Sequence, residues 1–301
     1  MSIVEKALKK QSLGAETASF AESPQASNPS PTLSSIKASG GGGLLGTYQR
    51  FFPEAGRFDV APAALVGCGL APHSKHEARQ LAQFRSIRKS ICDGLRASER
   101  VGQPAKRIIS ITSAFAAEGK TYTAFNVARS LARDGEYQVL LVDGDLAKRR
   151  LTTALGLMNA DGLAEALLPG GAGLASLSVA FGDSDLAILP AGRAYASASE
   201  RLASGELERQ LGELVDRYPK LVVIIDSGPI LLATEAEALV SASDAVVFVV
   251  RSGVTSRNAV RDAISRIGDA RPVSFVLNAW ESSGFGEQES YYGEYYGDVG
   301  G

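Results

Sequence analysis

The sequence has few of the residues that mark disulfide-rich or metal-binding proteins. Only two of its 301 residues are cysteine and two are histidine. Cys68 and Cys92 lie outside any CxxC pairing, so neither a disulfide framework nor a cysteine-based zinc site is predicted. We interpret both as structural thiols of a protein from a reducing compartment.

Long apolar runs and net charge are also scarce. The longest apolar runs, 221–225 and 245–250, are far shorter than the roughly 20 residues of a membrane-spanning helix, and the N-terminus has no apolar core of signal-peptide length. We therefore expect a cytoplasmic protein with no direct membrane span. The 31 basic and 33 acidic residues give a formal charge of −2, which gives no electrostatic reason to expect a nucleic-acid partner.

The N-terminal quarter has little of the patterning that folds a chain. Residues 1–10 place apolar side chains at helical spacing, which predicts a short amphipathic helix, with a frayed end as the alternative. From Gln11 to Gly46 the sequence is rich in Ser, Ala, Pro and Gly and buries too little apolar surface to fold. Residues 47–75 show no clear pattern, so we predict a flexible linker over 11–75.

The remainder alternates strand-like and helical patterns. A helical stretch begins near His76 and continues past Leu95. Strand 107–112, helix 120–134 and strand 138–142 then form a βαβ unit. Further strands are predicted at 186–189, 221–226, 245–250 and 274–277. This order predicts an α/β domain over 76–281 with the P-loop NTPase fold: a doubly wound, mostly parallel sheet flanked by helices.

A phosphate-binding loop is predicted where the first of these strands turns into a helix. Gly119, Lys120 and Thr121 stand at that turn, where backbone N–H groups and a helix N-terminus bind phosphate oxygens. Lys120 would reach the β- and γ-phosphates of ATP, and the Thr121 hydroxyl would ligate Mg²⁺. Ala117, Glu118 and Tyr122 complete the predicted nucleotide-binding segment. Ala114 replaces the first glycine of the full motif, so a chance GKT sequence is the alternative.

Three aspartates follow strands that should end at the same edge of the sheet. Asp143 and Asp145 come directly after one apolar strand and Asp226 ends another, so all three should converge on the phosphate site. Asp226 can hold Mg²⁺ or its water, and Asp143 or Asp145 can orient or deprotonate an attacking hydroxyl and complete the metal shell. Helix capping is the alternative role for any one of them.

The C-terminal segment 282–301 is rich in glycine, acidic residues and tyrosine. It predicts a flexible tail, with a low-complexity tail or a partner-bound edge strand as alternatives. Such a tail can enter the active site of a neighbouring subunit, and each phosphate added to it brings about −1.5 to −2 charges, enough to switch docking. The predicted phosphorylation sites are its clustered hydroxyls, Tyr291, Tyr292, Tyr295 and Tyr296.

Five motifs together resemble the bacterial tyrosine kinases of polysaccharide export: AFAAEGKT, VLLVDGDLAKRR, LVVIIDSGP, VVRSGVT and YYGEYYG. The resemblance covers roughly residues 76–301. It implies ATP·Mg²⁺ as phosphoryl donor, autophosphorylation between subunits of a homo-oligomeric ring, and activation by a membrane chain-length (co-polymerase) protein, through which the kinase would associate peripherally with the inner membrane. It also places Asn278 where the family contacts the adenine base.

The chain departs from the family pattern at several positions. Ala147 replaces the arginine after the DxD pair, although Lys148, Arg149 and Arg150 follow as either a solvated face or a phosphate or acidic-tail contact. Gly228 interrupts a proline pair, and Ala82 replaces the acidic residue that precedes Arg85 and Arg88 in the subunit-contact helix. Ala82, Ala147 and the Ala114 of the phosphate loop favour a catalytically silent regulatory partner as one alternative. A partitioning ATPase is the second, but Phe115 occupies the position of its signature lysine.

Overall fold

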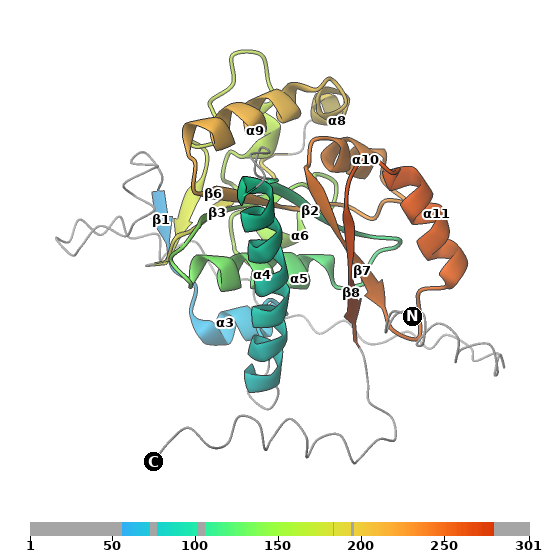
Figure 1. The fold of residues 1–301 in the computed structure, drawn as a ribbon. Helices are drawn as coiled ribbons and strands as arrows, with labels where there is room; N and C mark the ends of the chain where they lie inside the picture. The colour runs from blue at the N-terminus through green and yellow to red at the C-terminus, as the bar shows by residue number, and fades with distance from the viewer. Residues whose placement is uncertain (1–55, 73–76, 101–105, 183, 194–195, 280–301) are drawn as a thin grey trace, which may run out of the picture.

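The computed structural model describes residues 56–72, 77–100, 106–182, 184–193 and 196–279 (Figure 1). The predicted N-terminal helix, most of the predicted linker and the tyrosine tail lie outside these residues.

The described chain contains one sheet and helices on both of its faces (Figure 1). The strands are β1 (Gly56–Phe58), β2 (Ile108–Ser113), β3 (Gln138–Asp143), β4 (Val179–Phe181), β5 (Leu186–Leu189), β6 (Leu221–Asp226), β7 (Ala245–Arg251) and β8 (Val273–Asn278). The helices are α3 (Pro62–Gly67), α4 (Glu77–Arg100), α5 (Lys120–Ala132), α6 (Arg150–Ala154), α7 (Leu163–Ala166), α8 (Ala196–Leu202), α9 (Glu206–Arg217), α10 (Thr234–Ser241) and α11 (Arg257–Ile267).

The strand order is β1-β4-β5-β3-β6-β2-β7-β8. All neighbouring strands are parallel except β4 and β5, which are antiparallel. The central strands β2, β3 and β6 are buried along their whole length, as expected for parallel strands covered on both faces, and this explains their continuous apolar runs. The predicted doubly wound, mostly parallel sheet is confirmed.

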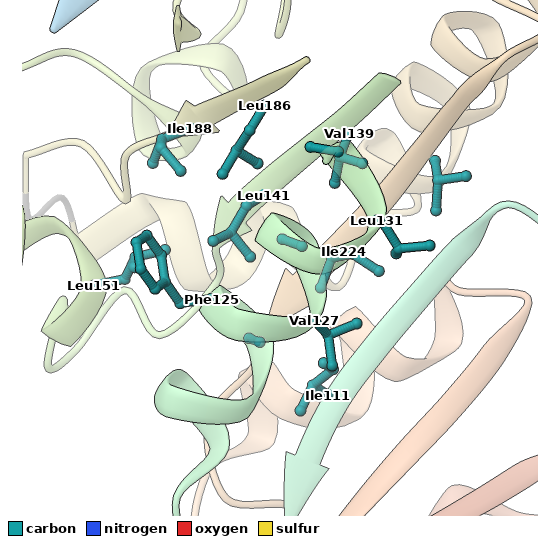
Figure 2. Close-up of a cluster of buried hydrophobic side chains, with 14 of the residues drawn as sticks. Ile111, Phe125, Val127, Leu131, Val139, Leu141, Leu151, Leu186, Ile188 and Ile224 are labelled. Carbon is teal, nitrogen blue, oxygen red and sulfur yellow. The ribbon is translucent and has the colours of Figure 1, made fainter. Parts of the chain in front are cut away.

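Two apolar layers enclose the sheet. On one face, α3, α4, α5 and α6 pack over the strands, and Phe125, Val127 and Leu131 of α5 lie against the β-strand side chains (Figure 2). On the other face, α9, α10 and α11 pack over two further clusters. Because α5 begins at Lys120 and is held along its buried face, the sheet fixes the position of the phosphate loop before it.

The flexible linker predicted over 11–75 is wrong over residues 56–72. Strand β1 pairs with β4 in parallel, and Phe58, Leu65 and Leu70 are buried in the main core. The Phe58 ring packs edge-on against Phe181, with 5.4 Å between the ring centroids. The domain therefore starts at least 20 residues before the predicted boundary at 76, and the added segment is anchored by tertiary contacts.

Among the residues that the structure describes, no helix has the length and apolarity needed to cross a bilayer.

Candidate active site

The predicted phosphate loop and acidic strand ends meet at one edge of the sheet. The loop connects β2 to α5, and it lies beside the ends of β6 and β3 because β2 neighbours β6 and β6 neighbours β3. In the β3–β6 register, Asp143 is directly opposite Asp226. The parallel topology therefore brings together the two acidic motifs that the sequence places more than 80 residues apart.

The phosphate loop has a backbone conformation that strongly restricts its sequence. Gly119 has φ 96° and Ala117 has φ 62°, both in the left-handed region that disfavours residues with a β-carbon. A β-carbon at Gly119 would lie 1.9 Å from Nδ2 of Asn278. Glycine is therefore required at 119 for both its conformation and its small size.

Side chains from neighbouring strands and loops hold the phosphate loop in place. The buried Glu118 carboxylate accepts a 2.7 Å hydrogen bond from the Phe115 N–H and another from the Thr255 hydroxyl. Asn278 Nδ2 donates to the Glu118 carbonyl at 2.9 Å. The Glu118 and Asn278 side chains thus stabilise the loop, and the adenine contact of Asn278 stays a prediction.

A pocket of about 860 Å³ opens beside the loop. Six predicted site residues line it: Ala117, Gly119, Lys120, Thr121, Tyr122 and Asp145. Four other predicted residues, Glu118, Asp143, Asp226 and Asn278, do not line the pocket. Each contacts or neighbours the phosphate loop or Asp145. The sequence motifs therefore come together at one cavity, which some of their residues line and others do not.

Lys120 is buried at the base of this pocket. Its side chain is 7% exposed, and Nζ donates to the Phe115 carbonyl at 3.5 Å. Burial lowers the pKa of Lys120, while the nearby Asp226 and Asp145 carboxylates oppose that shift. Because its one hydrogen bond is long, the ammonium group retains donors for phosphate oxygens.

Asp226 is a buried carboxylate that makes no hydrogen bond of normal geometry within the described chain, with the Thr121 hydroxyl as a neighbouring donor. It is 1% exposed, and neither carboxylate oxygen has a hydrogen-bond partner among the described residues. Burial raises the pKa of Asp226 to about 8, assisted by the charge of Asp143 and opposed by the Thr121 hydroxyl and Lys120. An unpaired buried carboxylate is costly unless a cation compensates it.

The donor set around Asp226 fits Mg²⁺. This ion binds proteins through one or two carboxylates together with substrate phosphates and retained waters. Asp226 and the Thr121 hydroxyl supply such a set beside the phosphate loop. In the described part of the chain, no group of three or more His, Cys, Asp or Glu residues is arranged to hold a metal, so the ion would need the nucleotide phosphates.

Asp143 lies behind the pocket, where it organises the segment after β3. Its Oδ2 accepts hydrogen bonds from the Thr152 N–H at 2.8 Å and the Thr152 hydroxyl at 2.7 Å, and its Oδ1 accepts from the Asp145 N–H at 3.3 Å. Burial raises the pKa of Asp143 to about 6, although these hydrogen bonds oppose it. Of the DxD pair, the structure brings Asp145 to the pocket surface.

Several pocket residues were not predicted as site residues. Helix α3 and the turn after it form one wall of the pocket, which includes Cys68 and Leu70. The segment after β3 contributes Lys148 and Arg150. Arg149 is directed elsewhere and donates to the Gly192 carbonyl at 2.9 Å. The basic run 148–150 was the only sequence feature that indicated any of these pocket residues. Nothing in the sequence of residues 64–70 indicates a pocket.

The departures in the predicted subunit-contact helix lie on α4. Ala82 and Arg85 are exposed, but Arg88 forms a 3.2 Å ion pair with Asp134 and donates to the Ser130 carbonyl at 3.3 Å. Arg88 is therefore used within its own subunit. Of the two arginines, Arg85 keeps an exposed side chain for a neighbouring molecule.

The parallel sheet, the phosphate loop and the acidic strand ends define a P-loop nucleotide-binding domain, and the family described as AAA domain matches residues 106–272. Tyrosine-protein kinase YwqD of Bacillus subtilis (strain 168) is 32% identical over 215 residues, which cover 71% of this chain and 85% of YwqD. The chain belongs to the bacterial tyrosine-protein kinase family. This confirms the resemblance drawn from the five sequence motifs.

Two further comparisons agree with this assignment. Succinoglycan biosynthesis transport protein ExoP of Rhizobium meliloti (strain 1021) is 29% identical over 227 residues, which cover 71% of this chain but only 28% of ExoP. The VpsO kinase domain superposes with a TM-score of 0.56 at 25% identity, covering 69% of this chain and all (100%) of that domain. The chain thus corresponds to a whole kinase domain and to a minor part of ExoP.

Proposed function

We propose that this protein is an ATP-dependent tyrosine autokinase that phosphorylates Tyr291, Tyr292, Tyr295 and Tyr296 and thereby regulates exopolysaccharide polymerisation or export. The observation that carries the proposal is the buried Asp226 carboxylate, whose oxygens make no hydrogen bond of normal geometry to any described residue, beside Lys120 and Thr121 of the phosphate loop. Such a carboxylate is suited to a nucleotide-bound Mg²⁺. Family membership supplies the reaction type.

In the proposed reaction, a tyrosine hydroxyl oxygen forms a bond to the γ-phosphorus of ATP while the bond from that phosphorus to the β–γ bridging oxygen breaks, and ADP leaves. Lys120 and the N–H groups of the loop bind the phosphates and stabilise the charge that develops on them. Mg²⁺, held by Thr121 and Asp226 with the phosphates, would supply additional charge neutralisation.

Asp145 is the proposed base, because it lies on the pocket surface. It would orient the tyrosine hydroxyl and accept its proton. Asp143, which is fully buried and accepts three hydrogen bonds, would act by positioning Asp145 and the segment that follows it. Nucleotide binding by Ala117 to Tyr122 and a base contact by Asn278 complete the proposed site.

Detection of phosphotyrosine in the C-terminal segment tests the proposed autokinase activity. Purified full-length protein incubated with ATP·Mg²⁺, with and without a candidate activator, should gain phosphotyrosine in the tail, detectable by mass spectrometry. Lys120→Met should abolish the signal, and replacement of the four tail tyrosines by phenylalanine should remove it without loss of ATP binding. Intact ATP binding with no phosphotyrosine under any of these conditions would reject the kinase and favour a silent nucleotide-binding regulator.

The silent regulator is the second candidate because of two specific observations. Ala147, two residues after Asp145, is exposed and carries no guanidinium, and Arg88 is engaged within its own subunit. For the partitioning ATPase, the position of the signature lysine is held by Phe115, which is 41% exposed. Rapid ATP hydrolysis without tyrosine phosphorylation would identify that third activity.

Family membership also supports a homo-oligomer and a membrane chain-length protein as activator. In this proposal the kinase is cytoplasmic and is held at the inner membrane through that partner. Co-purification of the full chain with such a protein, compared with a variant that lacks residues 1–46, tests whether the N-terminal segment makes the contact.

A further inference from the structure

The outer edge of β8 pairs with no strand in the described part of the chain. Strand β8 is the last in the sheet order, and its one neighbour there is β7 (Figure 1). We infer that this edge, together with the flank of α11 beside it, is a docking surface for the chain's own residues 285–290, which add to β8 as an antiparallel strand. The inference goes beyond the proposed kinase function and does not require it.

Alternate backbone groups of β8 point away from β7. The Pro272 carbonyl accepts a 3.0 Å hydrogen bond from the Val246 N–H, and the Asn278 carbonyl accepts one of 2.9 Å from the Ser252 N–H. The even-numbered residues therefore face β7. Because a strand alternates at every second residue, the N–H and carbonyl groups of the odd-numbered residues face outward. A row of such groups is a template for one more strand.

Two large apolar side chains lie along the same edge. Phe275 is 43% exposed and Leu277 is 42% exposed, and their spacing of two places both on one face of the sheet. The Phe275 ring packs edge-on against the buried Phe248 ring, with 5.9 Å between the centroids, and Phe248 belongs to the core cluster under α10 and α11. The strand sequence VSFVLN has no charged residue of the kind that shields an exposed edge. This edge therefore favours an occupant with an apolar or aromatic side chain.

The flank of α11 beside this edge is basic. Helix α11 packs with α10, which lies over β2, and Arg266 donates to Glu237 of α10 at 3.4 Å. Asp262 is about one turn from Arg266 and shares that flank, whereas Arg257 and Arg261, also one turn apart, lie on the opposite flank, toward β8. Both are exposed, and no residue of the described chain forms an ion pair with either. An acidic occupant would supply the partners.

The sequence after β8 can return directly to this edge. Six residues, 279–284, separate the strand from Phe285. A parallel pair would need a connection of roughly a dozen residues or more, so the returning strand is antiparallel. Ala279 has a φ of 54°, in the left-handed region that hairpin loops use, and the Ser-Ser-Gly sequence at 282–284 consists of turn-forming residues. These features favour a reversal of the chain after β8.

The side chains of the returning segment complement the surface. In an extended segment, Phe285, Glu287 and Glu289 share one face, and glycine, glutamine and serine occupy the other, because side chains alternate along a strand. With the first face toward α11, the aromatic ring covers the exposed apolar side chains of β8. The two carboxylates then pair with Arg257 and Arg261. The segment thus supplies both the apolar and the acidic groups that the surface lacks.

Docking of this segment also determines where the tyrosines lie. The phosphate loop follows β2 at the carboxyl edge of the sheet, and β7 and β8 run parallel to β2. An antiparallel strand on β8 runs away from that edge, so Tyr291 and Tyr292 emerge at the opposite edge of the sheet. The docked segment would therefore hold the tyrosines away from the phosphate loop of their own chain.

Amide hydrogen exchange tests the docking in the full-length protein without nucleotide, read residue by residue by NMR. The outward amides of Phe275 and Leu277 should exchange at least about tenfold more slowly than unprotected amides, because the returning strand accepts their hydrogen bonds. Arg257→Glu with Arg261→Glu should speed up that exchange by about threefold to tenfold, as expected for the loss of two exposed ion pairs. The Val276 amide faces β7, so its exchange should not change and reports that the sheet is intact.

Charge exchange tests the pairing of the carboxylates with the arginines. Glu287→Arg with Glu289→Arg should speed up exchange of the outward amides to the same extent, and the two pairs of substitutions combined should restore slow exchange. The matched control is Arg79→Glu with Lys89→Glu, which makes the same change of charge at exposed positions of α4, on the other face of the sheet. It should leave the outward amides unaffected.

The outcomes separate this inference from the kinase proposal, because the measurement requires no phosphoryl transfer. Exchange of Phe275 and Leu277 at the unprotected rate in the native chain, or exchange that neither pair of substitutions changes, overturns the docking surface. Protection that rises with protein concentration overturns docking within one chain and identifies the segment of a second copy as the occupant. Intact protection in a protein that forms no phosphotyrosine rejects only the kinase.

Discussion

The hydroxyl of Thr152 donates a 2.7 Å hydrogen bond to Oδ2 of the fully buried Asp143 and accepts one of 2.9 Å from the Ala191 N–H. This single side chain thus connects the end of β3 to the segment after β5. Thr152→Val keeps the shape but removes both hydrogen bonds. We expect it to lower the free energy of unfolding by about 1–3 kcal/mol, measured by urea denaturation. Thr153→Val, at an exposed neighbouring position, should change it by less than about 0.5 kcal/mol.

Replacing Asp143 or Asp226 by asparagine should change the melting temperature in opposite directions. Asp226→Asn removes a buried charge whose oxygens make no hydrogen bond of normal geometry with the described residues, so the nucleotide-free protein should melt at a higher temperature at pH 8.5. In Asp143→Asn, an amide N–H₂ group can face the Thr152 N–H and hydroxyl, which donate to the carboxylate in the native protein. Two donors would then face each other, so the melting temperature should fall. Thermal unfolding of both variants measures this, and a lower melting temperature for Asp226→Asn would contradict our account of the site.

Magnesium should stabilise the folded protein through Asp226. ATP·Mg²⁺ in excess should raise the melting temperature of the native protein by mass action. In Asp226→Asn the part of that increase that depends on Mg²⁺, obtained by comparison with ATP in EDTA, should be lost. Thr234→Val, at an exposed position outside the pocket, serves as the control and should retain the full Mg²⁺-dependent increase.

Stability should fall as pH rises. The folded-state pKa values of Asp143 and Asp226 are raised from 3.8 to about 6 and about 8, so the folded protein binds more protons than the unfolded chain. Their contribution is complete below pH 3.8 and is lost as pH rises through about 6 and then about 8, with a slope of up to about 1.4 kcal/mol per pH unit for each group. Denaturation at pH 5 to 8.5 measures the slope. In Asp226→Asn the part between pH 6 and 8 should flatten, and a curve parallel to that of the native protein would refute the assignment.

Gly119 and Asn278 should be coupled. Gly119→Ala places a β-carbon 1.9 Å from the Asn278 amide in a left-handed conformation. It should reduce ATP affinity by at least about tenfold, since either the Asn278 side chain or the strained loop must shift. Asn278→Ala in the same protein should recover only part of the loss, because residue 119 keeps its left-handed φ of 96°. Titration calorimetry of the single and double variants measures the coupling. Purely additive losses would show that the two side chains do not conflict.

The sequence predicted the central strands and the phosphate loop well because these features depend on local patterns. The runs at β6 and β7 are apolar and β-branched, as two-sided burial requires, and GKT after a buried strand has few other structural explanations. The boundaries of all six predicted strands fall within one residue of the structure. The helical stretch from His76 past Leu95 was also predicted, and on α4 Phe84 and Leu95 are buried at helical spacing.

The rest depended on contacts that no local pattern encodes. Strand β1 is three residues long, too short for an alternating signal, and its partner β4 is equally short. The different surroundings of Asp143 and Asp226 depend on Thr152, which donates to one and not the other. The sequence predicted that these carboxylates would converge. Only the tertiary structure shows that Asp143 accepts hydrogen bonds from Thr152 whereas the Asp226 oxygens make none of normal geometry in the described part of the chain.

The attachment of α3 has a consequence for the local stability of the pocket wall. The segment 56–72 joins the sheet through three register pairs with β4, whereas β3 and β6 share six. Its backbone amides should therefore exchange hydrogen faster than those of the central strands. Because Phe58, Leu65 and Leu70 are buried in the main core, side-chain packing is what holds this wall of the pocket in place.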